Sequence, residues 1–147
     1  MTGSEAEVHV DDETFPDAPV ASIEKAVRRT LEAEDRQDVE ISVALLTDED
    51  MQRLNLQYLG KDRTTDVLSF ALSGDDESPL GDIYLGLDQA ARQADEVGVP
   101  LAEELARLAI HGTLHVLGHD HPEGPERYES PMFQLQERLL REVLGSA

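Results

Sequence analysis

The alternation of apolar and polar positions predicts the secondary structure in the first third of the chain. Residues 5–12 and 40–46 follow the period of two that is typical of strands, and the second run is richer in β-branched side chains. Between them, residues 18–34 repeat apolar side chains at helical spacing, namely Val20, Ile23, Val27 and Leu31. This part of the chain is therefore expected to fold as strand, helix and strand.

The middle of the chain predicts a helix followed by a hairpin. The helix should begin after Thr47, in a capping box where Asp replaces the usual Glu, and should end at Gly60. Residues 66–72 and 80–87 are strand-like. The polar segment 73–79 between them predicts the connecting turn.

The last third of the chain has helical periodicity throughout. It predicts helices over residues 88–97, 101–117 and 131–144, the second of them entered through Pro100. Strands mixed with helices early, followed by helices alone, indicate an α+β fold. The length favours one domain over residues 1–147.

Charge narrows the possible functions. The chain carries 32 Asp and Glu against 12 Lys and Arg, a formal net charge of -20 at pH 7. So negative a surface argues against broad electrostatic binding to nucleic acid, which needs clustered cations, and it disfavours an anionic membrane. Salt near 1 M screens charges beyond roughly 3 Å and would permit such a negative surface. Our first interpretation of the negative charge is therefore a salt-rich cytoplasm, and a role in ordinary solubility is the alternative.

The absence of certain sequence features narrows the compartment and the type of metal site. The chain contains no Cys, so neither a disulfide framework nor a thiolate metal site is available. It has no run near the roughly 20 apolar residues of a membrane span, and its first residues do not resemble a signal sequence. We expect a cytoplasmic protein that does not bind membranes.

Four of the five histidines lie between positions 111 and 121. His111 and His115 are four residues apart on a predicted helix, so their side chains stack on one face. Gly118 is placed to end that helix in a left-handed conformation and to turn His121 back toward the other two. Three imidazoles with an open position are the ligand set of a catalytic zinc, so we predict a metal site there.

Other interpretations of the histidines stay open. The alternative for the whole cluster is a polar helix end with surface histidines. For His119 three roles are open: a fourth ligand, a partner of a ligand, or part of a pocket wall. Asp120 either orients a ligand imidazole or solvates the turn. His9 is interpreted as an exposed strand residue.

The helical motif differs from that of zinc proteases at one position. In those enzymes a Glu follows the first His and acts as the general base, whereas this chain has Gly112. Without this general base, peptide hydrolysis becomes a less favoured function for the site. A bound metal would still lower the pKa of water to about 7 and polarise a phosphoryl oxygen, so hydrolysis at neutral pH stays feasible.

A second candidate site lies in the turn after residue 60. Lys61 and Arg63 place two cations close together in a very acidic chain. This pair predicts contact with an anion. The alternative is a solvated turn in which the two cations form salt bridges with Asp62 or Asp66.

Together these segments resemble the YbeY family of bacterial metal-dependent endoribonucleases, also called rRNA maturation factors. The resemblance is carried by the block from His111 to His121, by Gly60-Lys61-Asp62 with Thr65-Asp66-Val67-Leu68-Ser69-Phe70, and by Leu80-Gly81-Asp82-Ile83. The helix that contains Met132-Phe133-Gln134-Leu135-Gln136-Glu137 is similar too.

The resemblance implies a fold, a cofactor and a function. The fold would be a mixed four-stranded sheet covered by about five helices, with a zincin-like site in which His111, His115 and His121 hold one Zn²⁺. The activity would be cleavage of single-stranded RNA. Our own hypothesis, from the cation pair in the turn, is that Lys61 and Arg63 bind the RNA phosphate. The role would be maturation of the 3′ end of small-subunit (16S) rRNA and ribosome quality control. The partners would be the small ribosomal subunit, ribosomal proteins and a ribosome-assembly GTPase.

Two positions depart from the family pattern. The family commonly has Arg where this chain has Leu59, so either Lys61 or Arg63 takes over the phosphate contact or the activity is weaker or differently directed. The family often has Tyr in place of His119, which puts an extra titratable group beside the metal. A non-catalytic assembly factor with a structural zinc and another metal hydrolase, such as a protease, are the alternative functions.

Overall fold

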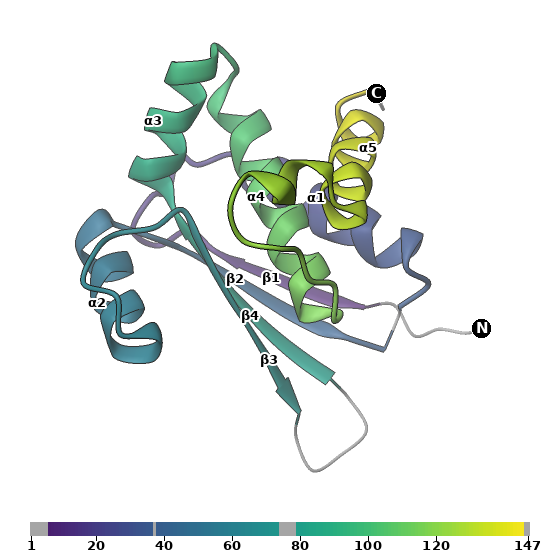
Figure 1. Ribbon diagram of the computed structural model, residues 1–147, viewed down its shortest axis with the longest axis horizontal. Coiled ribbons are helices and arrows are strands. Elements are labelled where there is room, and N and C mark those ends of the chain that lie inside the picture. The colour runs from purple at the N-terminus through teal and green to yellow at the C-terminus, as the bar shows by residue number, and fades with distance from the viewer. Residues whose placement is uncertain (1–5, 37, 74–78, 146–147) are drawn as a thin grey trace.

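The computed structural model describes residues 6–36, 38–73 and 79–145. Within these ranges it contains four strands, five α-helices and one short 3-10 helix (Figure 1). The elements are β1 (Glu7–Asp11), α1 (Val20–Ala33), β2 (Glu40–Leu46), α2 (Asp48–Leu59), β3 (Val67–Ser73), β4 (Pro79–Gly86), α3 (Leu87–Val97), α4 (Leu101–Val116), η1 (Pro125–Glu129) and α5 (Pro131–Gly145). The predicted α+β class is confirmed. None of the helices in the described ranges is long and apolar enough to cross a membrane.

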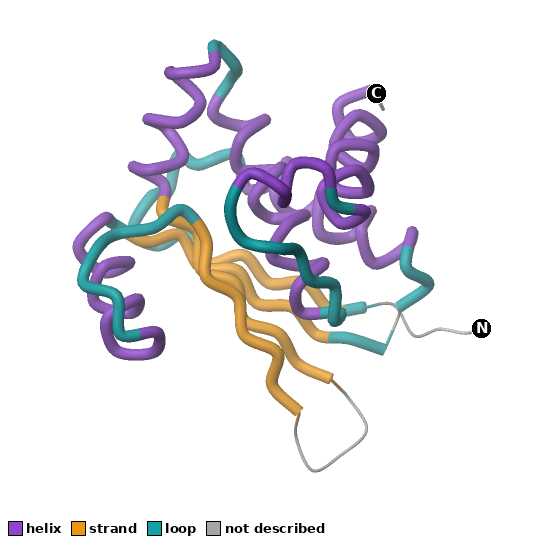
Figure 2. The backbone as a smooth tube through the Cα atoms, viewed as in Figure 1, coloured by secondary structure: helices purple, strands orange, loops and turns teal. Residues whose placement is uncertain are grey.

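The four strands form one mixed sheet in the order β1-β2-β4-β3 (Figure 2). β2 pairs in parallel with β1 and with β4, whereas β3 and β4 pair antiparallel as the predicted hairpin. Ser73 and Pro79 form the last residue pair of this hairpin, so both residues belong to the strands and not to the expected turn. The rest of that turn lies outside the described residues.

The boundary between β4 and α3 and the short helix η1 differ from the sequence prediction. β4 ends at Gly86, whose N–H donates to Asp66 O at 2.9 Å, and Leu87 already belongs to α3. The sequence placed Leu87 in the strand, because an apolar residue at the end of an apolar run fits both elements. η1 was not predicted, since its five residues are too few to show a helical period.

α4 and α2 cover opposite faces of the sheet. A Cβ added at Gly112 would lie 2.9 Å from Ile83 Cγ2, so α4 lies against β4 at a distance that only glycine permits. A Cβ at Gly86 would lie 3.1 Å from Met51 Cγ, a residue of α2. Because Ile83 and Gly86 are three positions apart on one strand, their side-chain directions point to opposite faces.

The main hydrophobic core lies on the α4 side of the sheet. It joins residues of α1, α4 and α5 to the inward positions of the strands, among them Ile23, Leu31, Ile41, Ile83, Leu105, Ile110, Leu114 and Leu139. Each fully buried Leu or Ile contributes about 1.5–3 kcal/mol by leaving water. This burial fixes α4, and with it the helix end that carries the predicted metal ligands.

Candidate metal centre

The turn after α4 has the geometry that the sequence predicts for it. Gly118 has φ 102°, in the left-handed region, and its N–H donates to His115 O at 3.0 Å. The next N–H, of His119, donates to Leu114 O at 2.9 Å. These two bonds form a Schellman motif, which satisfies the last helix carbonyls and reverses the chain. His121 is thereby brought back over the end of α4.

The structure brings the three predicted histidines together. His111, His115 and His121 each offer one ring nitrogen, and these three atoms lie within 4.8 Å of one another. The ring centroids are 4.6 Å apart for His111 and His115, 5.2 Å for His111 and His121, and 5.0 Å for His115 and His121. All three residues are partly buried and could hold a metal ion.

Hydrogen bonds fix the tautomer of each ring. His111 Nδ1 lies 2.7 Å from Gln136 Oε1, His115 Nδ1 lies 3.1 Å from His119 O, and His121 Nδ1 lies 2.9 Å from Pro122 O. Each of these oxygens can only accept, so each Nδ1 must carry the proton and donate it. In a neutral ring Nε2 then has a free lone pair, which is the form that a metal requires.

Gln136 belongs to a buried polar network behind His111. Its Nε2 donates to Glu137 Oε2 at 3.0 Å, which orients its Oε1 toward the imidazole. Glu137 accepts from Arg107 at 2.9 Å, and Arg107 also donates to Glu104 at 2.6 Å. Because Gln136 is only 5% exposed, these contacts and not solvent hold its amide. The network makes the position of His111 rigid.

The sequence analysis missed Gln136 as a supporting residue. It lies on the apolar stripe of α5, at helical spacing with Met132, Leu139 and Val143. A Gln at such a position needs a hydrogen-bond partner, because burial of an unpaired amide is costly. That interruption of an apolar stripe is the signal by which the residue could have been found.

Burial keeps two of the imidazoles neutral. It lowers the pKa of His111, although the hydrogen bond that His111 donates to Gln136 Oε1 acts in the opposite direction. Burial also lowers the pKa of His115, and the neighbouring His111 and His121 add to the effect. Both rings are therefore neutral near pH 7, with the proton on Nδ1 and the Nε2 lone pair available to a metal.

His119, Asp120 and His9 lie outside the cluster. His119 Nε2 lies 2.5 Å from Glu34 Oε1 at the end of α1, while its carbonyl supports His115. His119 is thus a partner of a proposed ligand through its backbone. Asp120 Oδ1 accepts from His121 N at 2.8 Å and so stabilises the turn. His9 lies on β1 with its side chain 61% exposed, as expected.

Packing against the sheet requires glycine at position 112 and so excludes the glutamate of the protease motif. Its position faces Ile83, and even a methyl group would approach that side chain to 2.9 Å. A glutamate at this position would have to displace the sheet. The general base of zinc proteases is therefore absent for reasons of packing as well as sequence.

A cavity of about 400 Å³ opens beside His111 and His121. Its walls come from the start of β3, from α3 and α4, and from η1 and α5. Two residues that the sequence analysis did not select, Arg127 and Tyr128, line it on the side of η1. Asp66, for which the sequence predicted no catalytic role, lines it directly before β3.

Lys61 and Arg63 lie in the exposed connection between α2 and β3 and are not among the residues that line this cavity. Within the described part of the chain neither forms an ion pair with Asp62 or Asp66. Asp62 accepts instead from Gln52 Nε2 at 2.8 Å. The two cations are thus free to contact an anion, and Leu59 beside them is 52% exposed.

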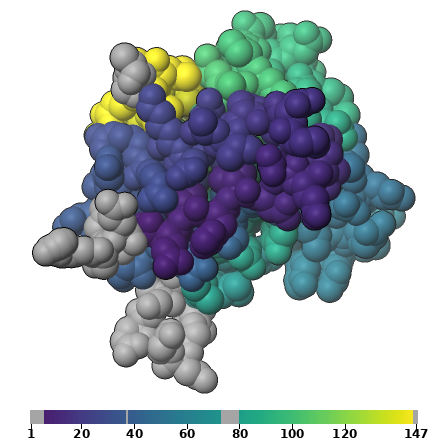
Figure 3. Space-filling model, turned by 180° about the vertical axis from the view of Figure 1, so that it is seen from behind, coloured from purple at the N-terminus to yellow at the C-terminus, as the bar shows by residue number. Residues whose placement is uncertain are grey.

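A second cluster also brings three ligand atoms within 4.8 Å, namely Glu7, His9 and Glu40. His9 Nε2 lies 3.6 Å from Glu7 Oε1 and 3.7 Å from Glu40 Oε2. The cluster spans β1 and β2, in the N-terminal part of the chain that covers much of the surface in Figure 3. None of these three side chains forms a hydrogen bond with a supporting residue among the described residues.

The fold and the site together define a class of protein. A mixed four-stranded sheet supports a helix end at which three preoriented imidazoles could hold a metal ion, beside an open cavity. Three nitrogen ligands with a position left open are typical of metal-dependent hydrolases. The sequence model of the family described as Endoribonuclease YbeY matches residues 7–144. The chain belongs to this family.

Relatives support the assignment. The Endoribonuclease YbeY of Carboxydothermus hydrogenoformans is 48% identical over 124 residues, 84% of each chain. That of Persephonella marina is 41% identical over 128 residues, covering 82% of this chain and 81% of the relative. A solution structure of a Thermotoga maritima protein, TM1509, has a TM-score of 0.64 at 29% identity and covers 95% of this chain and 89% of its own.

Proposed function

We propose that the protein is an endoribonuclease that cleaves single-stranded rRNA and that Zn²⁺, held by His111, His115 and His121, is its cofactor. The observation that carries this proposal is the set of three imidazoles whose Nε2 lone pairs are directed together by separate hydrogen bonds to Nδ1. Three nitrogen ligands with a position left open fit catalytic zinc. The names of the relatives supply the substrate class.

When bound, Zn²⁺ supplies Lewis-acid chemistry that polarises a phosphoryl oxygen and makes water acidic near neutral pH. The proton of the attacking hydroxyl, from water or from a ribose 2′-OH, needs an acceptor. Two carboxylates line the cavity, and Glu104 is occupied by Arg107 and by Gln93 Nε2 at 2.8 Å. The Asp66 carboxylate accepts only from the Thr65 hydroxyl at 3.4 Å within the described residues, so we assign proton acceptance to it.

Lys61 and Arg63 are proposed to bind the phosphate backbone outside the cavity. They extend from one exposed turn, and neither is neutralised by a carboxylate in the described part of the chain. In a chain of net charge -20, two such cations are a local exception that favours contact with RNA phosphate.

The resemblance to the family extends the proposal to the cell. The substrate would be the 3′ end of small-subunit (16S) rRNA in the cytoplasm. The small ribosomal subunit, ribosomal proteins and a ribosome-assembly GTPase would be the partners. Such partners would bring an acidic enzyme to its RNA without a broad basic surface.

Cleavage of a single-stranded RNA by zinc-loaded protein tests the proposal. We expect cleavage that is lost in chelator and in His115→Ala, and strongly reduced in Asp66→Asn. Product ends identify the nucleophile, because a 2′,3′-cyclic phosphate requires the ribose hydroxyl. Retained cleavage with no metal bound would overturn the proposal.

The departure at Leu59 favours one alternative, an assembly factor whose zinc is structural. Leu59→Arg restores the family's usual cation at an exposed position. A large gain in cleavage in this variant would show that the wild-type enzyme is active but weakened. Binding to small ribosomal subunits that His115→Ala leaves unchanged, without cleavage by any variant, would instead support the assembly factor.

A further inference from the structure

The cavity beside the metal centre is also lined by residues with a chemistry of their own. Arg127 and Tyr128 of η1 and Phe133 of α5 line it together with His111 and His121. The volume of about 400 Å³ lies in the range of small-ligand sites. A ligand that reaches the imidazoles therefore also meets these three side chains.

Arg127 has hydrogen-bonding capacity that the protein does not use. Its guanidinium carbon lies 4.9 Å from the centroid of the Tyr128 ring, and Nη2 donates to the Tyr128 hydroxyl at 2.9 Å. No carboxylate in the described ranges pairs with it. Arg107, which lines the same cavity, is by contrast held by Glu104 and Glu137. Most of the five N–H donors of Arg127 thus remain available for an anion.

Tyr128 provides an accessible aromatic surface next to this cation. Its side chain is 55% exposed, and its ring meets the Phe133 ring at 87° with centroids 5.4 Å apart. A large exposed aromatic residue at the mouth of a cavity, beside an unpaired guanidinium, is the combination on which nucleic-acid bases stack.

The backbone of this part of the cavity wall is held by hydrogen bonds. Ser130 Oγ donates to Arg127 O at 2.7 Å and accepts from Phe133 N at 3.2 Å, which joins η1 to the first turn of α5. Ser followed by Pro131 is a typical helix start, with Ser as the cap and Pro in the first turn. The backbone that carries Arg127, Tyr128 and Phe133 is therefore fixed before a ligand arrives.

We propose that Arg127 and Tyr128 form a nucleotide subsite of the active site. Arg127 binds a phosphate of the single-stranded RNA at the metal centre, and Tyr128 stacks on the adjacent base. The inference rests on the proposed endoribonuclease function and adds a site that selects unpaired nucleotides, since a base held in a duplex cannot stack on a protein side chain.

Binding of two oligonucleotides to zinc-loaded protein tests the subsite. The first is a short 2′-O-methyl single-stranded RNA, checked by gel to stay intact, and the second has the same backbone with abasic positions. Fluorescence anisotropy at several salt concentrations gives the affinity and its salt dependence for wild type and variants.

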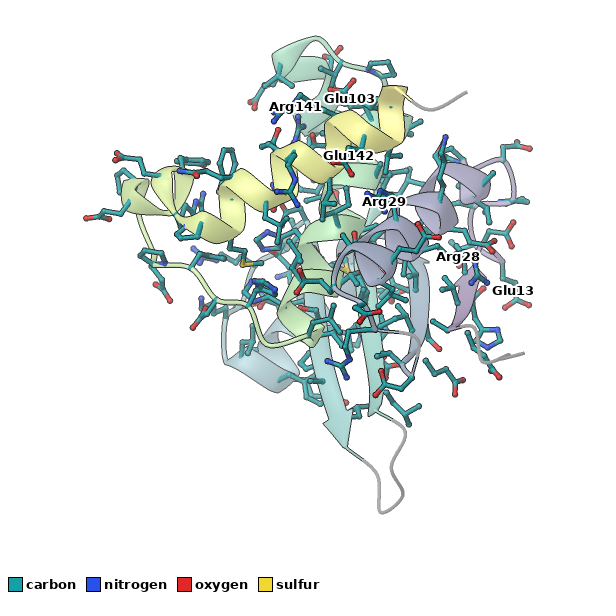
Figure 4. The ribbon with its side chains drawn as sticks, turned by 90° about the vertical axis from the view of Figure 1, so that its right-hand side faces the viewer. Glu13, Arg28, Arg29, Glu103, Arg141 and Glu142 are labelled. Atoms are coloured by element: carbon teal, nitrogen blue, oxygen red, sulfur yellow. The ribbon has the colours of Figure 1, made fainter. Side chains whose placement is uncertain are left out.

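Arg127→Ala should weaken binding of both oligonucleotides about tenfold and reduce the slope of log affinity against log salt by about 0.7. Tyr128→Ala should weaken only the base-containing RNA, about fivefold or more, with no change of slope. Tyr128→Phe keeps the ring and should bind as wild type. Arg141→Ala is the matched control, because this exposed cation lies on α5 about 15 Å along the helix from its start beside η1 (Figure 4).

Three results would overturn the subsite. The first is that Arg127→Ala binds as Arg141→Ala does, and the second is that Tyr128→Ala weakens binding of the abasic backbone as much as binding of the base-containing RNA. The third is that the loss of binding in either alanine variant equals its loss of folded protein, as measured by the thermal unfolding transition. If wild type binds neither oligonucleotide, the proposed function fails as well. Normal wild-type binding with unaffected variants refutes the subsite alone.

Discussion

Two clusters in this protein each place three ligand atoms within 4.8 Å of one another, and they are built very differently. His111, His115 and His121 are partly buried, and every ring is held through Nδ1 by an oxygen acceptor. Glu7, His9 and Glu40 extend from two adjacent strands into solvent, with His9 held only by the two carboxylates.

The difference shows that proximity alone does not make a metal site. At the exposed cluster, water screens the charges and each side chain keeps its rotamer freedom, which binding would have to remove. At the histidine cluster folding has already fixed the rings, and supporting hydrogen bonds make Nε2 the free nitrogen. We therefore expect tight metal binding at the histidine cluster and none of comparable strength at the exposed one.

Removing a proposed ligand should have the largest effect. His115→Ala deletes one of three nitrogen ligands, so we expect zinc affinity to fall by about a thousandfold or more. Competition with a chromophoric chelator measures this. Unchanged zinc affinity would contradict the assignment of the site.

Removing a supporting residue should have the next largest effect. Gln136→Leu fits the apolar stripe of α5 but leaves His111 Nδ1 without its acceptor, so zinc affinity should fall about 10–100-fold. The matched control is Gln134→Leu, an exposed position on the same helix. Gln136→Glu keeps an acceptor and should retain most of the affinity.

Changing the close contact between α4 and the sheet should mainly affect the free energy of unfolding. Gly112→Ala forces a methyl group to within 2.9 Å of the buried Ile83. Overpacking of this kind costs about 1–3 kcal/mol, offset by up to about 1 kcal/mol of helix propensity, so we expect a net loss of about 1–2 kcal/mol. Urea unfolding measures it. A stabilised variant would show that α4 can move away from β4.

Acid should destabilise the metal-free protein through the buried rings. Burial lowers the pKa of His111 and His115, so the unfolded chain takes up protons at a higher pH than the folded one. Their contribution to stability is fully present above about pH 6.5 and is lost as the pH falls through the lowered folded values. Urea midpoints at pH 7.5 and 5.5 should differ more in wild type than in His115→Ala.

Changing the exposed cluster should have the smallest effect. We expect His9→Ala to change the free energy of unfolding by no more than about 0.5 kcal/mol and to leave zinc affinity and stoichiometry unchanged. If the wild type binds a zinc ion that His9→Ala does not bind, the exposed cluster is a metal site and the contrast between the two clusters is wrong.

Much of this contrast could be predicted from the sequence, because it depends on local rules. The spacing of His111 and His115 and the left-handed turn at Gly118 are properties of one helix and its end. The supporting contacts could not be placed in this way. Gln136 and Glu34 come from elements 25 and 85 residues away from the groups they bind, and only packing brings them there.

For the fold, too, contacts between distant elements could not be predicted from the sequence. The hairpin and the helices follow from periodicity, and the α+β class follows from their order. The role of Gly112 needed the structure, because a close approach between α4 and Ile83 leaves no pattern in the sequence. Arg127 and Tyr128 were missed for a related reason, since the short η1 shows no period and their cavity is formed by distant elements.

The Schellman turn has a consequence for the order of folding. All three proposed ligands lie on one segment of eleven residues, so bringing them together closes only a short loop and needs no pairing between strands. The parallel strand pairs, which are far apart in sequence, form at a much greater cost in chain entropy. The end of α4 and its turn are therefore enough to bring the three imidazoles close together, whereas the acceptor that orients His111 arrives only when α5 packs against α4.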